Sequence, residues 1–363
     1  MKEPKIAIVA DWLTNYGGAE SVISAFHDLF PDAPIYTTMY KPDKMRELGN
    51  LKKIHTSWLD KIPFAKHQLL LGQMPTAVEM FNLDEYDIVL SSCHSVSKGV
   101  ITKPETLHIC YCHTPMRYAW ESWDLETRLK KFPRILHRVI RKKIKTIKEW
   151  DYCAAQRVDK YIANSTYISS QIKKYYNRDS YVIYPPVNTK KFQPVTNPSN
   201  DFYLAVGRLI PYKKFDLIVE VFNKIGKRMK IVGTGPDYKK IKKMAKPNVE
   251  ILGRVSDKEL SYLYSNCRAF VFPQIEDAGI VPLEAMSAGR PVIALNRGGS
   301  LDSMKEGITG IFFKEQNIES LSDAIFKFEK MSFDSNKIRA HAEQFDTEIF
   351  KKNILDFINN AKK

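Results

Sequence analysis

The run EDAGIVPLEAMSAGRPVIA, residues 276–294, is the most informative stretch of this sequence. An apolar, strand-like segment, CRAFVFPQ, precedes it. The run passes Gly279, enters a helix-like segment that closes at Gly289, and continues into a second strand-like segment, PVIAL. The pattern therefore predicts a strand, a loop, a helix and a strand, with the carboxylates of Glu276 and Glu284 at the loop and near the start of the helix.

The predicted helix start near Gly279 and Ile280 has backbone N–H groups without partners inside the helix. Such groups bind phosphate or sugar oxygens, and acidic side chains accept hydrogen bonds from vicinal hydroxyls in dinucleotide-binding folds. We interpret the loop as a site for a sugar and a diphosphate. Two alternatives remain open: Glu284 as a carboxylate that only stabilises the helix dipole, and Glu276 as a solvated loop acid.

The alternation of strand-like and helix-like segments extends through the whole chain. Strands that alternate with helices of ten or more residues indicate βαβ units and parallel sheets. Most of the strand-like segments are nearly continuous apolar runs, as expected for sheets covered on both faces. The sequence therefore predicts an α/β protein with two Rossmann-like, doubly wound domains that face a central cleft.

A segment rich in proline and asparagine, YPPVNTKKFQPVTNPSND, separates the two halves and is typical of a linker. We therefore predict an N-terminal domain over residues 1–185 and a C-terminal domain over residues 186–340. The last segment, residues 341–363, contains an amphipathic helix that needs a surface to cover. We expect it to pack back on the N-terminal domain.

Glycines follow several of the predicted strands: Gly17, Gly18, Gly207, Gly233, Gly235 and Gly253. In doubly wound folds, ligands bind outside the carboxyl ends of the strands. One glycine pair is weak evidence, because turns need glycine in any case. Several strand ends that carry glycine or carboxylate favour one binding crevice.

Residues 128–148 contain ten lysines and arginines and no acidic residue, in a chain whose net charge is +15. Apolar residues recur through this stretch as on a basic amphipathic helix. Such a helix could lie on an anionic membrane, bind nucleic acid through phosphates, or be a solvated helix with one face on the core. Of these possibilities, we expect that the stretch binds an anionic membrane surface, and we expect no binding of nucleic acid.

The remaining bulk features indicate a cytoplasmic enzyme. No 18 consecutive residues are apolar, so we expect no transmembrane span, and we interpret the start, MKEPKIAIVADW, as a first strand and not a signal peptide. The five cysteines are odd in number and scattered, which fits reduced thiols. A zinc site at Cys110, Cys112 and His113 is disfavoured, because a strand would point the histidine away from both sulfurs.

Five motifs together resemble the retaining glycosyltransferases of family 4, which have the GT-B architecture. They are GGAE after the first strand, CHTP after a middle strand, GRLIPYKKFDLIVEVF, VGTGP, and the run at residues 276–294. The similarity is close over residues 201–315 and looser over residues 1–200. HTPMRYAW together with EDAGIVPLEA most resembles the mannosyltransferases of bacterial O-antigen or capsule assembly.

The resemblance implies roles for the motif residues. Arg208 and Lys213 would clamp the donor diphosphate, with Lys214 as a second candidate where the family usually has glycine. Glu284 would hold the ribose and Glu276 the donor sugar. The resemblance also implies a sugar-contacting histidine, His113, and two phosphate-loop glycines, Gly17 and Gly18. It further implies a base contact at Val255 and a loop that offers backbone N–H groups, formed by Ala278, Gly279 and Ile280.

Three of these assignments have plainer alternatives. Arg208 and Lys213 could be surface residues beside a helix start, His113 could be a structural histidine, and Gly17 and Gly18 could form a tight turn. This sequence departs from the family pattern at Ala278, where many relatives carry an aromatic residue, so the sugar pocket could differ.

The resemblance predicts transfer of a hexose, first of all mannose from GDP-mannose, to a lipid-linked oligosaccharide at the inner face of the cell membrane. We expect no metal cofactor, because Arg208 and Lys213 supply the positive charge and no strand-end Asp-x-Asp motif is present. Two other classes remain open: a sugar-nucleotide epimerase of the same fold, and a non-catalytic basic protein that binds glycan or nucleic acid.

Overall fold

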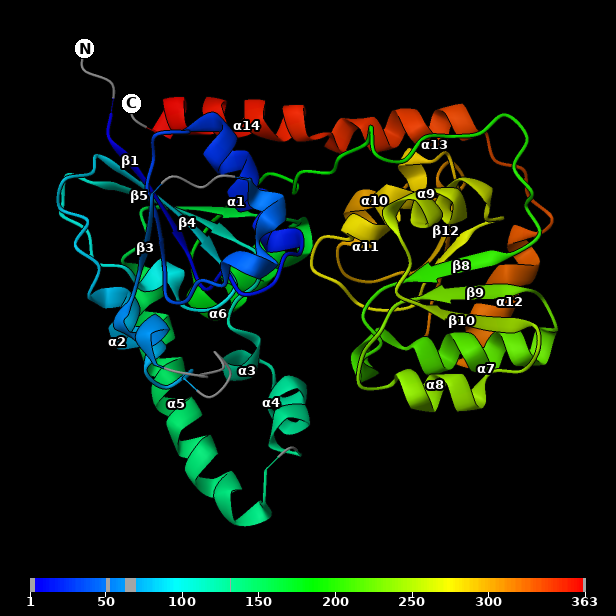
Figure 1. The fold of residues 1–363 in the computed structure, drawn as a ribbon, viewed down its shortest axis with the longest axis horizontal. Helices are drawn as coiled ribbons and strands as arrows, with labels where there is room; N and C mark the ends of the chain where they lie inside the picture. The colour runs from blue at the N-terminus through cyan, green and yellow to red at the C-terminus, as the bar shows by residue number, and fades with distance from the viewer. Residues whose placement is uncertain (1–3, 50–52, 63–69, 131, 362–363) are drawn as a thin grey trace. The chain divides into compact units, whose positions relative to one another are not determined.

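The computed structural model describes residues 4–49, 53–62, 70–130 and 132–361. The chain divides into two compact units (Figure 1). The first unit comprises Met1–Pro185 and Phe350–Lys363, and the second comprises Pro186–Ile349. Each unit is built on one parallel sheet flanked by helices, which confirms the predicted α/β, doubly wound class.

The first unit contains a seven-stranded sheet in the order β3-β2-β1-β4-β5-β6-β7, with every neighbouring pair parallel. Its strands are β1 (Ile6–Ala10), β2 (Ile35–Thr37), β3 (Ile54–Thr56), β4 (Ile88–Cys93), β5 (Leu107–Cys112), β6 (Lys160–Ala163) and β7 (Tyr181–Val182). Its α-helices are α1 (Gly18–Leu29), α2 (Met74–Glu79), α3 (Arg117–Trp120), α4 (Ser122–Leu129), α5 (Arg134–Gln156), α6 (Thr166–Tyr176) and, from the end of the chain, most of α14 (Thr347–Ala361). Short 3₁₀ helices are η1 (Pro42–Lys44), η2 (Arg46–Leu48), η3 (Trp58–Lys61) and η5 (Ser97–Gly99).

The central strands of this sheet are buried on both faces because successive side chains point to opposite sides. In β1, Ile8 and Ala10 pack with the core cluster under α1, whereas Ala7 and Val9 pack with the cluster under α2 and α5. All four side chains are at most 1% exposed. This two-sided burial explains why the strand reads as a continuous apolar run.

Helix α14 packs into the core of the first unit although it ends the chain. Phe350, Ile354 and Ile358 belong to the same buried cluster as Ile8 and Phe26. The Phe350 and Phe26 rings stack with centroids 6.1 Å apart.

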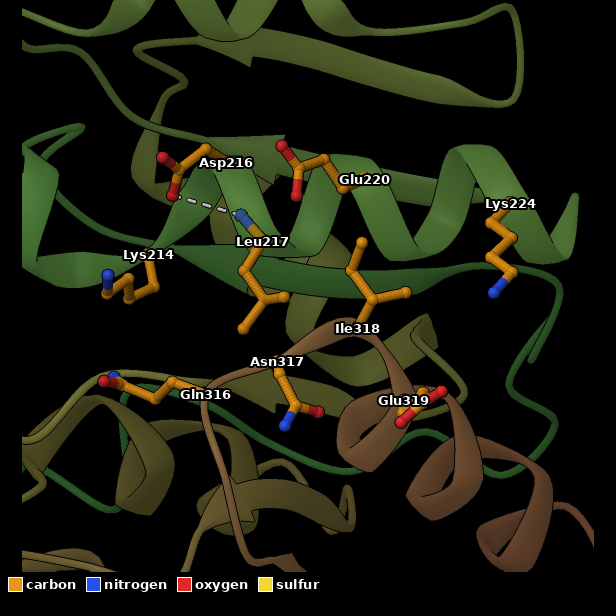
Figure 2. Close-up of a pocket in the computed structure, with 9 residues that line it drawn as sticks. All are labelled: Lys214, Asp216, Leu217, Glu220, Lys224, Gln316, Asn317, Ile318 and Glu319. Carbon is orange, nitrogen blue, oxygen red and sulfur yellow. Dashed lines mark hydrogen bonds between the residues drawn. The ribbon is translucent and has the colours of Figure 1, made fainter.

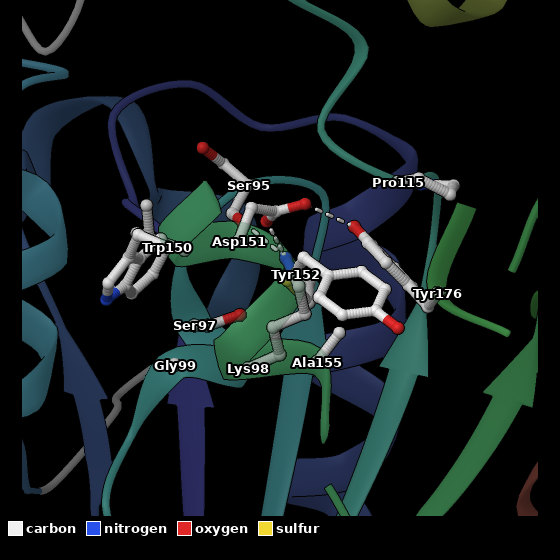
Figure 3. Close-up of polar contacts among 12 residues, drawn as sticks. Ser95, Ser97, Lys98, Gly99, Pro115, Trp150, Asp151, Tyr152, Ala155 and Tyr176 are labelled. Carbon is white, nitrogen blue, oxygen red and sulfur yellow. Dashed lines mark hydrogen bonds and ion pairs between the residues drawn. The ribbon is translucent and has the colours of Figure 1, made fainter. Parts of the chain in front are cut away.

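A buried ion pair pins several elements of the first unit together (Figure 3). The ammonium of Lys98 in η5 contacts the carboxylate of Asp151 in α5 and donates a hydrogen bond to Ser95 O at 2.9 Å. Asp151 also accepts hydrogen bonds from Tyr176 Oη at 2.8 Å and Trp120 Nε1 at 2.7 Å. Lys98 and Asp151 are at most 1% exposed, so each depends on the other to compensate its buried charge.

The second unit contains a six-stranded parallel sheet in the order β10-β9-β8-β11-β12-β13. Its strands are β8 (Tyr203–Val206), β9 (Met229–Val232), β10 (Val249–Gly253), β11 (Phe270–Phe272), β12 (Val292–Leu295) and β13 (Gly310–Phe313). Its helices are α7 (Phe215–Ile225), α8 (Tyr238–Met244), α9 (Asp257–Asn266), α10 (Ile280–Ser287), α11 (Ser300–Ser303), α12 (Ile318–Phe328) and α13 (Ser335–Ala342), with 3₁₀ helices η6 (Pro211–Lys213) and η7 (Glu343–Phe345).

The prediction of one helix over residues 128–148 is wrong in extent. Helix α4 ends at Leu129, and α5 begins at Arg134 with Pro133 as its N-cap. Proline lacks a backbone N–H and disfavours helical backbone in the residue before it, so it separates the two helices. One residue of the stretch, Lys131, lies outside the described residues. None of the helices described is both long and apolar enough to cross a membrane.

Candidate functional site

Three motif residues of the second unit, Arg208, Val255 and Glu276, lie on loops at one edge of its sheet. Because the strands are parallel, the segments that follow β8, β9, β10, β11 and β12 all leave from the same edge. Arg208 follows β8, Val255 follows β10, and Glu276 follows β11. The two strands that lead to Arg208 and Glu276 are neighbours in the sheet.

Lys213 and Glu276 contact one another directly. Lys213 closes the short helix η6, and its Nζ lies 2.9 Å from Glu276 Oε1. Lys213 and Glu276 therefore form an ion pair by distance, but the angles between their atoms are not those of a hydrogen bond. The two side chains are only 15% and 19% exposed, so their attraction is weakly screened. The structure therefore brings together two residues that lie far apart in the sequence.

A glycine pair after β12, which the sequence analysis did not single out, holds the Glu276 loop in place. The Gly299 N–H donates to Glu276 O at 2.8 Å. Gly298 has φ +74°, and a Cβ at this position would lie 2.6 Å from the same carbonyl oxygen. A side chain there would displace the loop, so glycine is required. The signal in the sequence is a Gly-Gly pair between a strand and a helix, as at Gly17 and Gly18.

Helix α10 begins at Ile280, as the sequence predicts, and its first turn has N–H groups to offer. Gly279 is the N-cap with φ +66°, and no side chain caps the helix. Pro282 in the first turn has no N–H, which leaves those of Ile280 and Val281 as the free donors of the turn. Ala278, just before the cap, is buried. This helix start can bind an anionic or sugar oxygen.

Glu284 lies further along α10 and has a partner that the sequence analysis missed. The Tyr264 hydroxyl, on α9, donates to Glu284 Oε2 at 2.8 Å. Burial raises the pKa of the Glu284 carboxyl to about 7. Near neutral pH this carboxyl can therefore be protonated or ionised, and its ionised form accepts hydrogen bonds most strongly.

The raised pKa of Glu284 makes the stability of the protein depend on pH in a defined direction. Between the ordinary value of 4.5 and about 7, the folded state holds the proton and the unfolded state does not. We therefore expect the unfolding free energy of the wild type to fall relative to Glu284→Gln as pH rises through this interval, with a slope of at most about 1.4 kcal/mol per pH unit. Urea unfolding of both proteins at pH 5, 6, 7 and 8 measures the difference, and a constant difference would contradict the expectation.

Arg208 is exposed and forms no ion pair or hydrogen bond within the part of the chain that the structure describes. It therefore remains available to a ligand. Lys214 has φ 56° and ψ 35°, a left-handed conformation that favours glycine. This geometry explains why glycine is common at the position in the family that the sequence resembles.

Lys214 lines a hollow of about 560 Å³ between α7 and the start of α12 (Figure 2). The lining side chains carry both charges and include Asp216, Glu220, Lys224 and Glu319. None of Arg208, Lys213, Glu276 or Glu284 lines it. The hollow is therefore not the candidate site itself, although Lys214, which lines it, directly follows Lys213.

The predicted site residues of the first unit also lie at the carboxyl edge of its sheet. Gly17 and Gly18 are exposed at the start of α1, where Gly17 is the N-cap and no side chain caps the helix. His113, directly after β5, is 9% exposed. Its Nε2 lies 2.8 Å from Ser92 Oγ, and its carbonyl oxygen accepts from Asn164 Nδ2 at 2.9 Å. Burial lowers the pKa of His113 to about 3, so the ring is neutral and can donate a hydrogen bond but not a charge.

Asp11, at the end of β1, organises this edge and was not recognised from the sequence. Its buried carboxylate accepts hydrogen bonds from the backbone N–H groups of residues 94–97 at 2.6–3.0 Å. It also pairs with His94 Nδ1 at 2.8 Å, which raises the pKa of His94 to about 9. The edge therefore carries one charged histidine, His94, and one neutral histidine, His113. A carboxylate directly after the first strand is the only signal in the sequence.

Comparison with known proteins identifies the second unit. Residues 187–345 match the family model described as Glycosyl transferases group 1. The second unit is a group 1 glycosyltransferase domain. The matched range contains Arg208, Lys213, Glu276 and Glu284, and it confirms the predicted glycosyltransferase family for this domain.

Relatives extend the similarity beyond the domain. The chain is 30% identical over 179 residues to an uncharacterized glycosyltransferase of Methanocaldococcus jannaschii, a match that covers 48% of this chain and spans half of that protein's length. It is 25% identical over 317 residues to the alpha-1,3/1,6-mannosyltransferase ALG2 of Dictyostelium discoideum, covering 73% of this chain and 72% of that protein.

Solved structures confirm the fold. The crystal structure of Anabaena Alr3699/HepE in complex with UDP-glucose superposes with a TM-score of 0.70 at 18% identity, covering 99% of this chain and 100% of that one. The chain, whose second unit matches the group 1 glycosyltransferase model, therefore has the GT-B fold.

Proposed function

We propose that this chain is a retaining glycosyltransferase that moves mannose from GDP-mannose to a lipid-linked oligosaccharide in cell-surface polysaccharide synthesis. The observation that carries the proposal is the Lys213–Glu276 pair, with Arg208 and Glu284, at the carboxyl edge of a group 1 glycosyltransferase domain. The relative named as an alpha-1,3/1,6-mannosyltransferase supports mannose as the sugar.

In this proposal, the second unit binds the donor. Arg208 and Lys213 hold the diphosphate, with Lys214 as an additional cation, and the N–H groups at Gly279 and Ile280 donate hydrogen bonds to phosphate and sugar oxygens. Glu284 accepts hydrogen bonds from the ribose hydroxyls and Glu276 from the hydroxyls of the sugar. Val255 contacts the base through its backbone, and Ala278 borders the sugar. Without donor, Lys213 and Glu276 neutralise one another, and the diphosphate then competes with Glu276 for the ammonium.

The chemistry follows from where charge develops. As the glycosidic bond breaks, negative charge grows on the leaving diphosphate, and preorganised cations and N–H groups stabilise it. The leaving phosphate takes the proton of the acceptor hydroxyl on the same face, which retains the anomeric configuration. For Gly17 and Gly18, at the start of α1, we propose the phosphate-binding role that the resemblance implies. The neutral His113 ring donates to the sugar and adds no charge of its own.

A panel of nucleotide sugars tests the proposal. The purified protein is titrated with GDP-, UDP- and dTDP-sugars while its thermal midpoint is measured, because a ligand that binds the folded state raises the midpoint. Donor hydrolysis and transfer to a lipid-linked acceptor are then measured with the best ligand. The proposal predicts the largest shift and turnover with GDP-mannose, whereas no turnover with any sugar nucleotide would refute it.

The same panel separates the competing functions. A UDP-hexose donor, which the UDP-glucose complex of Alr3699/HepE favours, predicts the largest shift with a UDP-sugar. An epimerase would convert the donor without any acceptor. A non-catalytic basic protein would bind polyanions with strong salt dependence, and its binding would be indifferent to Glu284→Ala.

We further propose that residues 128–148 hold the enzyme on anionic membrane. The first turns of α5 and the segment before it expose Phe132, Ile135, Leu136 and Val139, and Ile135 is 83% exposed. Further along α5, Ile147 is buried against the core. The start of α5 therefore offers apolar side chains among lysines and arginines, a composition that binds the interface of an anionic bilayer.

Removing two of these charges should weaken binding to vesicles that contain anionic lipid. Because each basic residue near the surface contributes about 1 kcal/mol, we expect Lys142→Gln/Lys143→Gln to lower the partition coefficient by roughly 25-fold. Lys239→Gln/Lys243→Gln on α8 is the matched control and should leave it unchanged. Sedimentation with vesicles measures all three proteins, and equal binding would show that the α5 charges do not contact lipid.

A further inference from the structure

A second polar pocket lies in the second unit, away from the candidate donor site. It has a volume of about 250 Å³. Arg268 precedes β11 and Arg290 precedes β12, so the pocket lies at the amino ends of these strands. The loops that carry Arg208 and Glu276 leave from the carboxyl ends of the same sheet. The two sites are therefore on opposite edges of one sheet.

Arg290 lines this pocket and is 6% exposed. Its Nη1 donates to Asn200 Oδ1 at 2.9 Å, whereas its Nε is enclosed and has no acceptor. No carboxylate among the residues that the structure describes forms an ion pair with this guanidinium. A buried charge without a counter-charge is costly, and each unsatisfied buried group requires an explanation such as a bound ion.

The charged groups around Arg290 leave the pocket positive. Arg268 is exposed and lies 3.5 Å from Glu329 Oε1, and that carboxylate also contacts Lys227 at 2.6 Å and accepts from Tyr203 Oη at 3.0 Å. The Asp334 carboxylate accepts hydrogen bonds from the backbone N–H groups of Asn336 and Lys337 in the first turn of α13. Both of these acids are therefore already engaged, and neither contacts Arg290.

We propose that this pocket binds a phosphate-class oxyanion, with Arg290 as its principal cation. A planar guanidinium matches the geometry of phosphate oxygens and binds them with charge-assisted hydrogen bonds. Arg268, Asn200 and Ser335 line the same pocket and add donors. The other wall consists of Phe328, Met331 and Phe333, which leaves an apolar side for a short carbon chain on a phosphate monoester.

The test uses thermal unfolding at constant ionic strength, with sodium chloride exchanged for sodium phosphate. Because phosphate would also bind Arg208 and Lys213, the parent protein carries Lys213→Met. We expect phosphate to raise the midpoint of this parent by roughly 5 °C at 100 times Kd. Adding Arg290→Met should abolish the rise, whereas adding Arg228→Met, which removes an exposed arginine, should not.

A further comparison distinguishes the source of the phosphate. A larger shift with glycerol 1-phosphate than with inorganic phosphate would support a small phosphorylated metabolite, and equal shifts would support the free ion. Ser335→Asp gives a second way to disable the pocket if Arg290→Met does not fold, because it places a negative charge at the start of α13, where helices tolerate acids. A phosphate shift that survives both Arg290→Met and Ser335→Asp, or no shift beyond chloride in the parent, would overturn the proposal.

Discussion

Lys213→Met is expected to lower the rate of sugar transfer by about 10²–10³-fold, equivalent to roughly 2.7–4 kcal/mol of transition-state stabilisation. Its side chain is 15% exposed and lies in the loop region where the leaving diphosphate is proposed to bind. A cation in such a partly desolvated site stabilises developing negative charge far more than a cation in water does. The loss should appear in kcat as well as in kcat/KM, because the charge grows only as the bond breaks.

The control for this variant is Lys224→Met, which removes a lysine from the other end of the adjacent helix α7. It should leave turnover within about twofold, because surface charges remote from a site contribute little. Initial rates with saturating and limiting donor measure both variants. A loss of less than about threefold for Lys213→Met would show that this lysine does not hold the leaving group.

Lys98→Met is expected to lower the unfolding free energy of the first unit by about 3–5 kcal/mol. The substitution leaves the Asp151 carboxylate buried, with Tyr176 and Trp120 as hydrogen-bond donors but no counter-charge. The lost contacts also connect η5 with α5, so the turn after β4 should loosen. Urea denaturation followed by far-UV circular dichroism measures the change.

An exposed ion pair provides the control for Lys98. Lys5 lies 3.2 Å from Glu85, and their side chains are 51% and 63% exposed. Because exposed pairs contribute about 0–1 kcal/mol, Lys5→Met should change stability by no more than that. Equal effects of Lys5→Met and Lys98→Met would contradict the role assigned to the buried pair.

The arrangement of strands and long helices could be predicted because their signals are local. Helix α6 has a clear local signal at each end, since Ser165 caps its start and Asn177 ends it in a left-handed conformation. Short elements with little burial escaped prediction: β3 has three residues, two of them exposed, so no apolar period marks it. The sequence does not reveal the break at Pro133 by its pattern, because basic and apolar residues continue on both sides of the proline.

The candidate site could be predicted only in part. Motif spacing predicted the position of Glu276, which comes soon after an apolar strand, and the start of α10, which comes directly after Gly279. Tyr264, Gly299 and Asp11 were missed because each acts through a contact with a residue distant in the sequence. The role of Asp11 becomes visible only when the turn after β4 is seen to close around its carboxylate.

The crystal structure of the protein with its best-binding sugar nucleotide tests the central claim most directly. We predict that the diphosphate lies within hydrogen-bond distance of Arg208 and Lys213, that Lys213 has left Glu276, and that Glu284 contacts the ribose. A diphosphate bound instead in the hollow between α7 and α12, with the Lys213–Glu276 pair unchanged, would contradict the account.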